Sequence, residues 1–292
     1  MQACPEATLL GHANYVGPKW ETGDAAQKTF NDRGVQETLL GYLTDMEKIQ
    51  RGMEKARIVI GKAGHDYDCV AYEGGPSGYT FNATPEQAEA QEKYGKSLAM
   101  GVAALDAWLG SYEKGWTYQN FLAYSQGKWW SSHTAFADGF RPCPGWLAMT
   151  LRNRFATGDL VKVEAQTMPV LSRGKESYPL IRCSAMRDGK RWSVFVLSRK
   201  LNAKYDDQDF GDGNTPVTLH LPFRKCGKIT LHKLAGDPRA SNREKMTIEI
   251  QSQEVPAAAL DGGTFVVNER SGGGARGMPP GSIYLYVFEA TE

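Results

Sequence analysis

The sequence predicts a chain of two parts, an α/β part followed by an all-β part. Three observations support this fold class. The first half alternates strand-like and helix-like segments, and the second half contains short strand-like segments with no helix between them. The chain also has 292 residues, enough for two domains of ~150 residues each. Because the pattern changes near Gly158–Leu160, we expect one domain over residues 1–159 and a second over residues 160–292.

The first part alternates three strands with three helices. Apolar residues at Val35, Leu39, Leu43 and Met46 have the spacing of an amphipathic helix. Thr84-Pro85-Glu86-Gln87 has the residue types of a helix start. Strand and helix order predicts a parallel sheet with helices outside it. The expected strands are Leu9–Val16, Asp68–Tyr72 and Asn120–Ser125, and the expected helices are Gly34–Ile60, Thr84–Leu109 and Pro144–Phe155.

The second part reads as an antiparallel β-sandwich. Its short apolar segments are separated by turns rich in Gly, Asn, Asp and Pro. The expected strands are Val161–Glu164, Leu180–Ala185, Trp192–Leu197, Val217–Leu221, Lys228–Leu234, Met246–Ile250, Thr264–Val267 and Ile283–Glu289.

Composition excludes several classes of protein. A net charge of +1 and 41% hydrophobic residues argue against a disordered chain and against a nucleic-acid partner, which needs a clustered basic surface. No apolar run is long enough to span a membrane, so we expect no membrane partner. Met1–Leu10 has no basic region followed by an apolar one, so no signal peptide is visible. The compartment is left open, with an extracellular or periplasmic location compatible with a missing N-terminus.

Residue types that can bind metals are scattered along the sequence. The five cysteines are widely spaced without a Cys-x-x-Cys pair, and the sequence leaves disulfides open. The acidic stretch Asp206–Asn214 departs from the ligand spacing of a Ca²⁺ loop, so we interpret it as a solvated loop. We expect no metal and no cofactor.

Glu73 is the strongest candidate for chemistry. It follows the buried strand Asp68–Tyr72 and precedes Gly74-Gly75-Pro76. The carboxyl ends of parallel strands carry the active site in α/β folds. Two glycines allow a sharp bend and the approach of a ligand that a Cβ would block.

Aromatic and polar residues follow all three expected strands. The chain has 31 aromatic residues, 11% of its length, and rings beside hydrogen-bonding groups suit sugars. We therefore expect an oligo- or polysaccharide substrate. One of the two adjacent tryptophans is expected to lie buried under the last helix, and a lone histidine is more often structural than catalytic. The candidate substrate-binding residues are Tyr15, Trp20, Tyr72, Trp129, Trp130 and His133.

These motifs together resemble a known family. Asn14-Tyr15 with Trp20, then Ala71–Pro76, then Trp129–His133 resemble the C-terminal part of a clan A glycoside hydrolase, such as the arabinofuranosidases and β-xylosidases. The segments Gly145–Arg154 and Leu285–Glu289 follow in the order that this family has. The resemblance implies a partial (β/α)8 barrel of about three β/α units, strands 6 to 8, followed by the β-sandwich.

The resemblance also implies a retaining mechanism. Glu73 matches the nucleophile, Tyr15 a residue that hydrogen-bonds it, and Trp129 or Trp130 the floor of the sugar site. The family's acid/base lies on the fourth strand, which this chain does not reach. Asn268-Glu269 lies among the sandwich strands and does not take that role. Without the acid/base, the isolated chain is expected to be nearly inactive, and a second chain or a missing N-terminal segment would complete the barrel.

Two other functions stay open at this stage. The chain could be a non-catalytic carbohydrate-binding or assembly protein derived from a glycosidase and keeping the aromatic residues. A small flavodoxin-like enzyme is disfavoured, because no glycine-rich phosphate loop follows the first strand.

Overall fold

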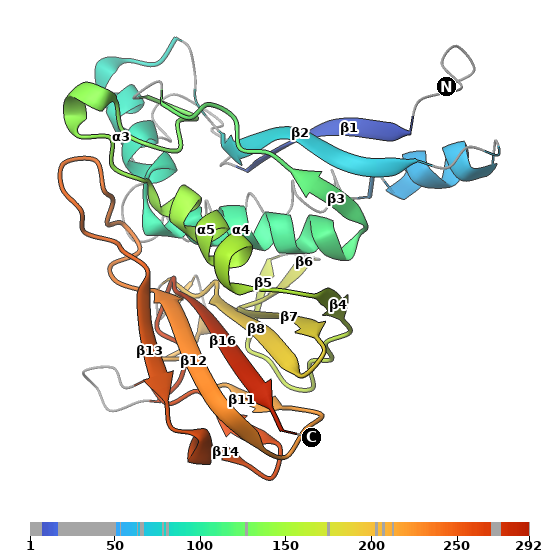
Figure 1. Ribbon diagram of the computed structural model, residues 1–292. Helices are drawn as coiled ribbons and strands as arrows, with labels where there is room; N and C mark the ends of the chain where they lie inside the picture. The colour runs from blue at the N-terminus through green and yellow to red at the C-terminus, as the bar shows by residue number, and fades with distance from the viewer. Residues whose placement is uncertain are drawn as a thin grey trace.

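The computed structural model describes residues 8–16, 51–52, 54–62, 64, 67–77, 79, 82–125, 128–173, 176–201, 204–205, 208–211, 213–269 and 276–291. Within these residues the protein has a mixed α/β fold in three layers (Figure 1). A parallel sheet forms one outer layer, helices α4 (Leu98–Glu113) and α5 (Pro144–Phe155) lie in the middle, and antiparallel sheets form the other side. No helix in this part of the chain is long and apolar enough to cross a membrane.

The parallel sheet has the order β1-β2-β3. Strand β1 (Leu9–Val16) has the predicted bounds, and β2 (Asp68–Pro76) is longer than predicted because the glycines and Pro76 still pair with β1. The prediction of a strand over Asn120–Ser125 is wrong, since β3 is Trp116–Gln119. The buried Trp116 ring anchors β3 beside Cys69. Beyond β3, among the described residues, only the backbone N–H groups of Asn120 and Leu122 still donate to β2, before the positive φ of 57° at Ala123.

The predicted helix Thr84–Leu109 is two helices, α3 (Pro85–Gly95) and α4. Thr84 and Gln87 form the expected capping box at the start of α3. The helix is interrupted at Lys96-Ser97, and the Ser97 hydroxyl caps α4, accepting from the backbone N–H of Met100 at 3.3 Å. Helix α5 has its predicted bounds. Most of the predicted helix Gly34–Ile60 lies outside the described residues, although residues 54–60 are helical.

Helix α4 is buried on nearly all sides because it lies between two sheets. Its alanine-rich face, with Met100 and Trp108, packs against Val16 of β1 and against the two-stranded sheet of β5 (Val170–Arg173) and β6 (Glu176–Pro179). Its leucine face packs against α5 and the large antiparallel sheet. An all-round apolar helix of this kind is typical of a buried position.

The large antiparallel sheet has six strands in the order β13-β12-β16-β8-β7-β4. Its central strands are apolar on both faces, because one face packs on α4 and α5 and the other on a small three-stranded sheet. The strands are β4 (Asp159–Val161), β7 (Ile181–Asp188), β8 (Arg191–Ser198), β12 (Cys226–Leu234), β13 (Gln251–Val255) and β16 (Ile283–Ala290). The small sheet contains β11 (Thr218–His220), β14 (Leu260–Asp261) and β15 (Thr264–Val266).

Seven of the eight expected strands overlap observed strands, and Met246–Ile250 does not. That segment is instead held by Asn242, whose amide donates to the carbonyl of Ile248 and whose carbonyl oxygen accepts from the backbone of Thr247 and Ile248. Strand β13 was missed because its residues, Gln251–Val255, are mostly polar and exposed. Two short elements outside the large sheet are the strand pair β9 (Lys204–Tyr205) and β10 (Gln208–Asp209), and two 3-10 turns lie at Phe136–Asp138 and Ala257–Ala259.

A buried ionic network joins the helices to the large sheet. The Asp106 carboxylate on α4 is fully buried and accepts two hydrogen bonds from the Arg199 guanidinium, at 2.6 and 2.8 Å. Arg182 on β7 lies 3.3 Å from the same carboxylate and also binds Glu113. The two parts of the chain are therefore packed together through paired charges as well as through apolar contacts.

Candidate active site

Glu73 and Tyr15 meet near the carboxyl ends of β2 and β1. The pairing register places His12 opposite Ala71 and Ala13 opposite Glu73, so β2 carries one extra residue, Tyr72. Such a bulge re-aims the side chains beside it. As a result Glu73 lies beside the Tyr15 phenol, close enough to affect its ionisation. Burial and the neighbouring Glu73 charge raise the pKa of Tyr15, so it stays a protonated donor.

The two glycines after Glu73 serve the packing of the strand ends. A Cβ at Gly74 would lie 2.5 Å from the carbonyl oxygen of Asn14. Gly75 has a φ of +128°, and a Cβ there would lie 3.1 Å from the Phe121 ring. The sequence analysis expected a ligand in this space. The structure corrects this, because protein atoms from β1 and from the segment after β3 occupy it.

Asn14, which the sequence analysis did not select, fixes the end of β1. Its side chain is buried and its amide donates to the Ser111 hydroxyl at 3.1 Å and to the Gln119 side chain at 3.0 Å. The Gln119 amide in turn donates to the carbonyl of Trp108 on α4. An asparagine inside an apolar strand was the available signal, since a buried amide needs partners. Tyr15 therefore follows a residue that is tied to both α4 and β3.

Trp129 and Trp130 lie in the loop after β3, on the side of α3. Both rings are half-buried, so the prediction that α5 would bury one of them is wrong. Their centroids are 5.3 Å apart, and the Trp130 ring is 5.8 Å from the ring of Tyr79. Both the carbonyl and the N–H of Trp129 make hydrogen bonds with side chains. Its carbonyl accepts from the Tyr79 hydroxyl and the Lys96 ammonium, and its N–H donates to Glu92.

Lys96 and Glu92 form a buried pair behind this loop. The Lys96 ammonium also donates to the carbonyl of Ser131 at 2.6 Å. Burial lowers the pKa of Lys96 and raises the pKa of Glu92, while the attraction between the two charges opposes both shifts. The pair holds the tryptophan loop in one conformation, which is what a rigid ring platform requires.

His133 is a structural histidine in this geometry, although it was expected to bind substrate. It is 5% exposed, its Nδ1 lies 2.9 Å from the Ser132 hydroxyl, and its ring stacks on Phe140. Burial lowers its pKa, so the ring is neutral at pH 7. Of the other expected contacts, Tyr72 is 57% exposed, and Trp20 lies outside the described residues.

Comparison with known proteins places the fold. No family model and no curated protein matches the chain. Among solved structures, it is similar to the family 51 arabinofuranosidase of Xanthomonas axonopodis pv. citri, with a TM-score of 0.69, 14% identity, and coverage of 96% of this chain and 52% of that one. The family 51 α-L-arabinofuranosidase of Bifidobacterium longum gives a TM-score of 0.62 at 16% identity, with coverage of 96% and 53%. The chain shares the fold of about half of each of these arabinofuranosidases.

The resemblance noted in the sequence is thus confirmed at the level of the fold. An arabinose-bound family 51 α-L-arabinofuranosidase is also similar, with a TM-score of 0.56, 12% identity, and coverage of 96% of this chain and 37% of that one. The chain spans about half the length, or less, of these solved arabinofuranosidases.

Glu269, the glutamate that follows Asn268, has a structural environment. Its carboxylate pairs with Lys233 on β12 at 2.6 Å. Burial and the Glu269 charge raise the pKa of the neighbouring Tyr284. These partners lie in the antiparallel part, as the sequence analysis expected.

Lys200 binds backbone carbonyls in the described part of the acidic stretch Asp206–Asn214. Its ammonium donates to the carbonyls of Phe210, Gly211 and Gly213, at 3.1, 2.5 and 3.1 Å. A cation from the protein therefore already satisfies these oxygens. Among the described residues, no group of three or more His, Cys, Asp or Glu side chains could hold a metal ion. Cys69, Cys143, Cys183 and Cys226 are free thiols, and Cys4 lies outside the described residues.

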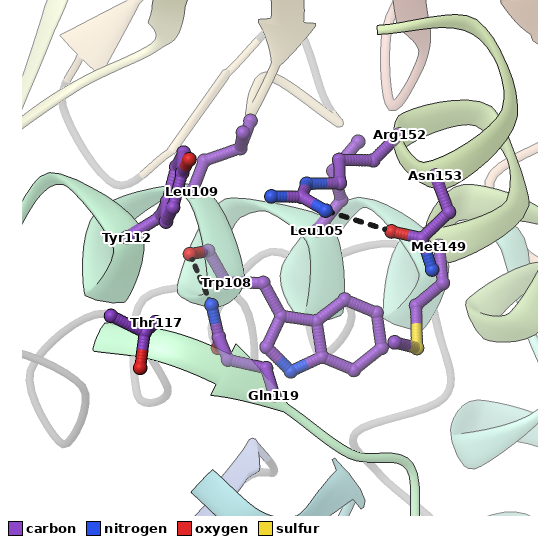
Figure 2. A pocket seen from close by; sticks show the side chains of 9 residues that line it. All are labelled: Leu105, Trp108, Leu109, Tyr112, Thr117, Gln119, Met149, Arg152 and Asn153. Carbon is purple, nitrogen blue, oxygen red and sulfur yellow. Dashed lines mark hydrogen bonds between the residues drawn. The ribbon is translucent and has the colours of Figure 1, made fainter. Parts of the chain in front are cut away.

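A small cavity lies away from Glu73, between α4, β3 and α5 (Figure 2). Its volume of about 50 Å³ is well below the ~300 Å³ of a ligand pocket. Figure 2 shows Gln119 bonded to the carbonyl of Trp108, and Arg152 bonded to Asn153, along its walls. The cavity is a packing gap between layers rather than a sugar site.

Proposed function

We propose that the chain is the C-terminal portion of a retaining glycoside hydrolase, with Glu73 as its nucleophile. Residues 1–159 then form part of a (β/α)8 barrel, with β1, β2 and β3 as its sixth to eighth strands, and residues 160–292 form a β-sandwich. The observation that carries the proposal is that Tyr15 and Glu73 lie side by side near the carboxyl ends of parallel strands. In a barrel this end carries the catalytic groups.

The proposed reaction begins with attack of a Glu73 oxygen on the anomeric carbon. The glycosidic C–O bond breaks, a proton from a second carboxylate reaches the leaving oxygen, and a covalent glycosyl-enzyme forms. Water, activated by the second carboxylate, then cleaves this ester. Tyr15 holds one oxygen of Glu73 and so directs the other toward the sugar. Tyr72, Trp129 and Trp130 are proposed to line the sugar site.

The second carboxylate is proposed to come from further β/α units, on a second chain or a preceding segment. In retaining enzymes it lies ~5–5.5 Å from the nucleophile. Within the described residues, β1 and β3 each pair with one strand only, so each leaves an open parallel edge. Open edges are normally paired or covered. The similarity to arabinofuranosidases supports a pentose-containing oligo- or polysaccharide as the substrate.

Covalent labelling tests the assignment of Glu73. An activated 2-deoxy-2-fluoro pentoside carries its own good leaving group, so it needs no acid catalyst. We expect one glycosyl adduct on the peptide that contains Glu73, measured by mass spectrometry. Glu73→Gln should abolish the adduct, while the matched control Glu269→Gln should keep it. An adduct on another residue, or equal labelling of E73Q, would refute the assignment.

Hydrolysis of aryl glycosides tests whether the isolated chain lacks the acid/base carboxylate. The isolated chain should be nearly inactive on aryl glycosides with poor leaving groups. Rapid turnover of such a substrate, lost in E73Q, would show that an acid/base lies within this chain.

The runner-up is a carbohydrate-binding or assembly protein that keeps the aromatic residues without catalysis. Its support is that the chain spans about half of the arabinofuranosidases it resembles. Sugar binding that survives Glu73→Ala, together with no covalent adduct in the wild type, would favour this function.

A further inference from the structure

Three rings form a stacked column in the loop between β3 and α5. The Phe140 ring lies between the other two. Its centroid is 4.6 Å from that of His133, with the planes at 14°, and 4.4 Å from that of Phe136, with the planes at 4°. His133 is buried at one end, and Phe136 is 74% exposed at the other. The aromatic column of His133, Phe140 and Phe136 therefore presents one flat ring to solvent.

The loop that carries the column is rigid. An isolated β-bridge joins His133 to Pro142, and Thr134 and Arg141 exchange two hydrogen bonds, at 2.9 and 2.8 Å. The Arg141 guanidinium also donates to the carbonyls of Asn242 and Arg243 in the antiparallel part. A loop held at both ends loses little conformational entropy when a ligand binds. The exposed ring is thus pre-organised.

The exposed end has the chemistry of a sugar platform. His133 is held neutral by burial, so the column is an uncharged aromatic stack. The carboxylate of Asp138, two residues after Phe136, is exposed and can accept hydrogen bonds from hydroxyl groups. A flat ring that meets C–H groups, beside an acceptor for hydroxyls, fits one face of a furanose or pyranose.

The column connects to the candidate active site through further rings. The Tyr124 ring is 4.7 Å from His133 and 5.8 Å from Trp146. Trp146 is 6.0 Å from Phe121, whose ring packs on Gly75, two residues after Glu73. A series of ring contacts therefore links the column to the end of β2 that carries the proposed nucleophile.

We propose that Phe136 is a sugar-binding platform that holds a distant residue of a polysaccharide while another residue occupies the Glu73 site. The ligand class rests on the proposed function. A protein partner fits less well, since a stable interface needs ~20–30 residues on each side. Phe136 and Tyr124 are the large apolar side chains of this loop, among the described residues, that are exposed.

Titration with linear α-1,5-arabinohexaose and β-1,4-xylohexaose tests the platform, with affinity measured by calorimetry on the catalytically blocked Glu73→Gln chain. We expect one of the two sugars to bind about fivefold to tenfold more weakly to Phe136→Ala, as expected for a lost ring contact. Phe136→Trp should bind at least as well as the parent. Phe136→Leu keeps apolar bulk without a flat ring and should behave like Phe136→Ala.

Two results would overturn the platform. Binding of both hexasaccharides unchanged in Phe136→Ala would remove its basis. Self-association of the chain that Phe136→Ala abolishes and Phe136→Leu keeps would assign the ring to a protein contact instead. The small fluoro-pentoside does not reach Phe136, so Phe136→Ala should still be labelled on Glu73. Failure of labelling alone therefore refutes the proposed nucleophile, and failure of the hexasaccharide test alone refutes the platform.

Discussion

At the scale of single residues, the position of Glu73 depends on its neighbours along and across the sheet. The bulge at Tyr72 turns two successive side chains of β2 to one face. Tyr72 lies over Gly11, and Glu73 lies beside Tyr15. Gly11 and Tyr15 share a face of β1 because strand side chains alternate. Asn14 points the other way, into α4. A substitution at Tyr15 should therefore affect the carboxylate without disturbing the packing on α4.

Tyr15→Phe should slow the covalent labelling of Glu73 by about tenfold or more, since a hydrogen bond to a charged group contributes ~1.5–3 kcal/mol. The measurement is the rate of adduct formation with the fluoro-pentoside. The midpoint of thermal unfolding serves as the control and should change little, because Tyr15 is only partly buried. Equal labelling rates in the two proteins would contradict the role given to the phenol.

His133 should titrate below the ordinary histidine value, because burial disfavours its charged form. We expect the C2–H resonance of His133, assigned by its loss in His133→Asn, to shift with a midpoint below pH 6.5. The unfolded chain binds this proton near pH 6.5 and the folded chain only at lower pH. Stability from this site is therefore complete above pH 6.5 and falls as the pH drops below it. A midpoint at or above 6.5 would show that the ring is not buried in the column.

At the scale of elements, the sequence predicted those helices and strands whose residue pattern agrees with their packing in the fold. Strand β1 and helix α5 have their predicted bounds, and the capping box of α3 was read from four residues. The break between α3 and α4 was missed because Lys96 and Ser97 look like ordinary helix residues. What breaks the helix is tertiary, since Lys96 binds the carbonyl of Ser131 and Ser97 bridges to Ser241.

Some residues of the candidate site could be predicted from the sequence, and others could not. Glu73 and Tyr15 follow from the rule that parallel strands deliver their carboxyl ends to one edge. Phe136, Phe140 and Tyr124 could not be found from the sequence, because their stacking depends on a loop closed by Thr134 and Arg141 rather than on any periodic pattern. The ion pair of Asp106 could not be predicted from the sequence either, because its partner Arg199 lies 93 residues away in the chain.

Asp106→Asn should destabilise the protein by about 3–5 kcal/mol, because it leaves buried guanidinium groups without their carboxylate. Chemical denaturation measures the change. The double variant Asp106→Leu with Arg199→Met should recover much of the loss, since it removes both charges. Lys162→Ala breaks an exposed pair with Glu164 and is the matched control, expected to change stability by at most ~0.5 kcal/mol. A loss in Asp106→Asn no larger than this control would show that the network does not hold the layers together.

At the scale of the whole molecule, the three layers leave one sheet face without a cover in the described residues. Asn14 and Val16 of β1 point into α4, so the odd-numbered residues of β1 face away from it. Thr117 and Gln119 of β3 likewise line the cavity beside α4, which turns Tyr118 to the opposite face. Leu9, Tyr72 and Tyr118 on that face are 54%, 57% and 65% exposed. In a closed barrel this face would be the interior.

The uncovered face predicts how the isolated chain behaves. In the part of the chain that the structure describes, large apolar side chains lie beside two parallel edges that pair with no further strand. Such a surface favours association, so the sedimentation coefficient should rise with protein concentration. Tyr118→Lys should suppress this rise and change the free energy of unfolding by no more than ~0.5 kcal/mol, because an exposed side chain loses little on substitution. Val266→Lys, at a 49% exposed position on the small antiparallel sheet, is the matched control and should leave association unchanged. A chain that stays monomeric and loses more than ~2 kcal/mol with Tyr118→Lys would mean that this face is already covered. The proposed need for further β/α units would then lose its support.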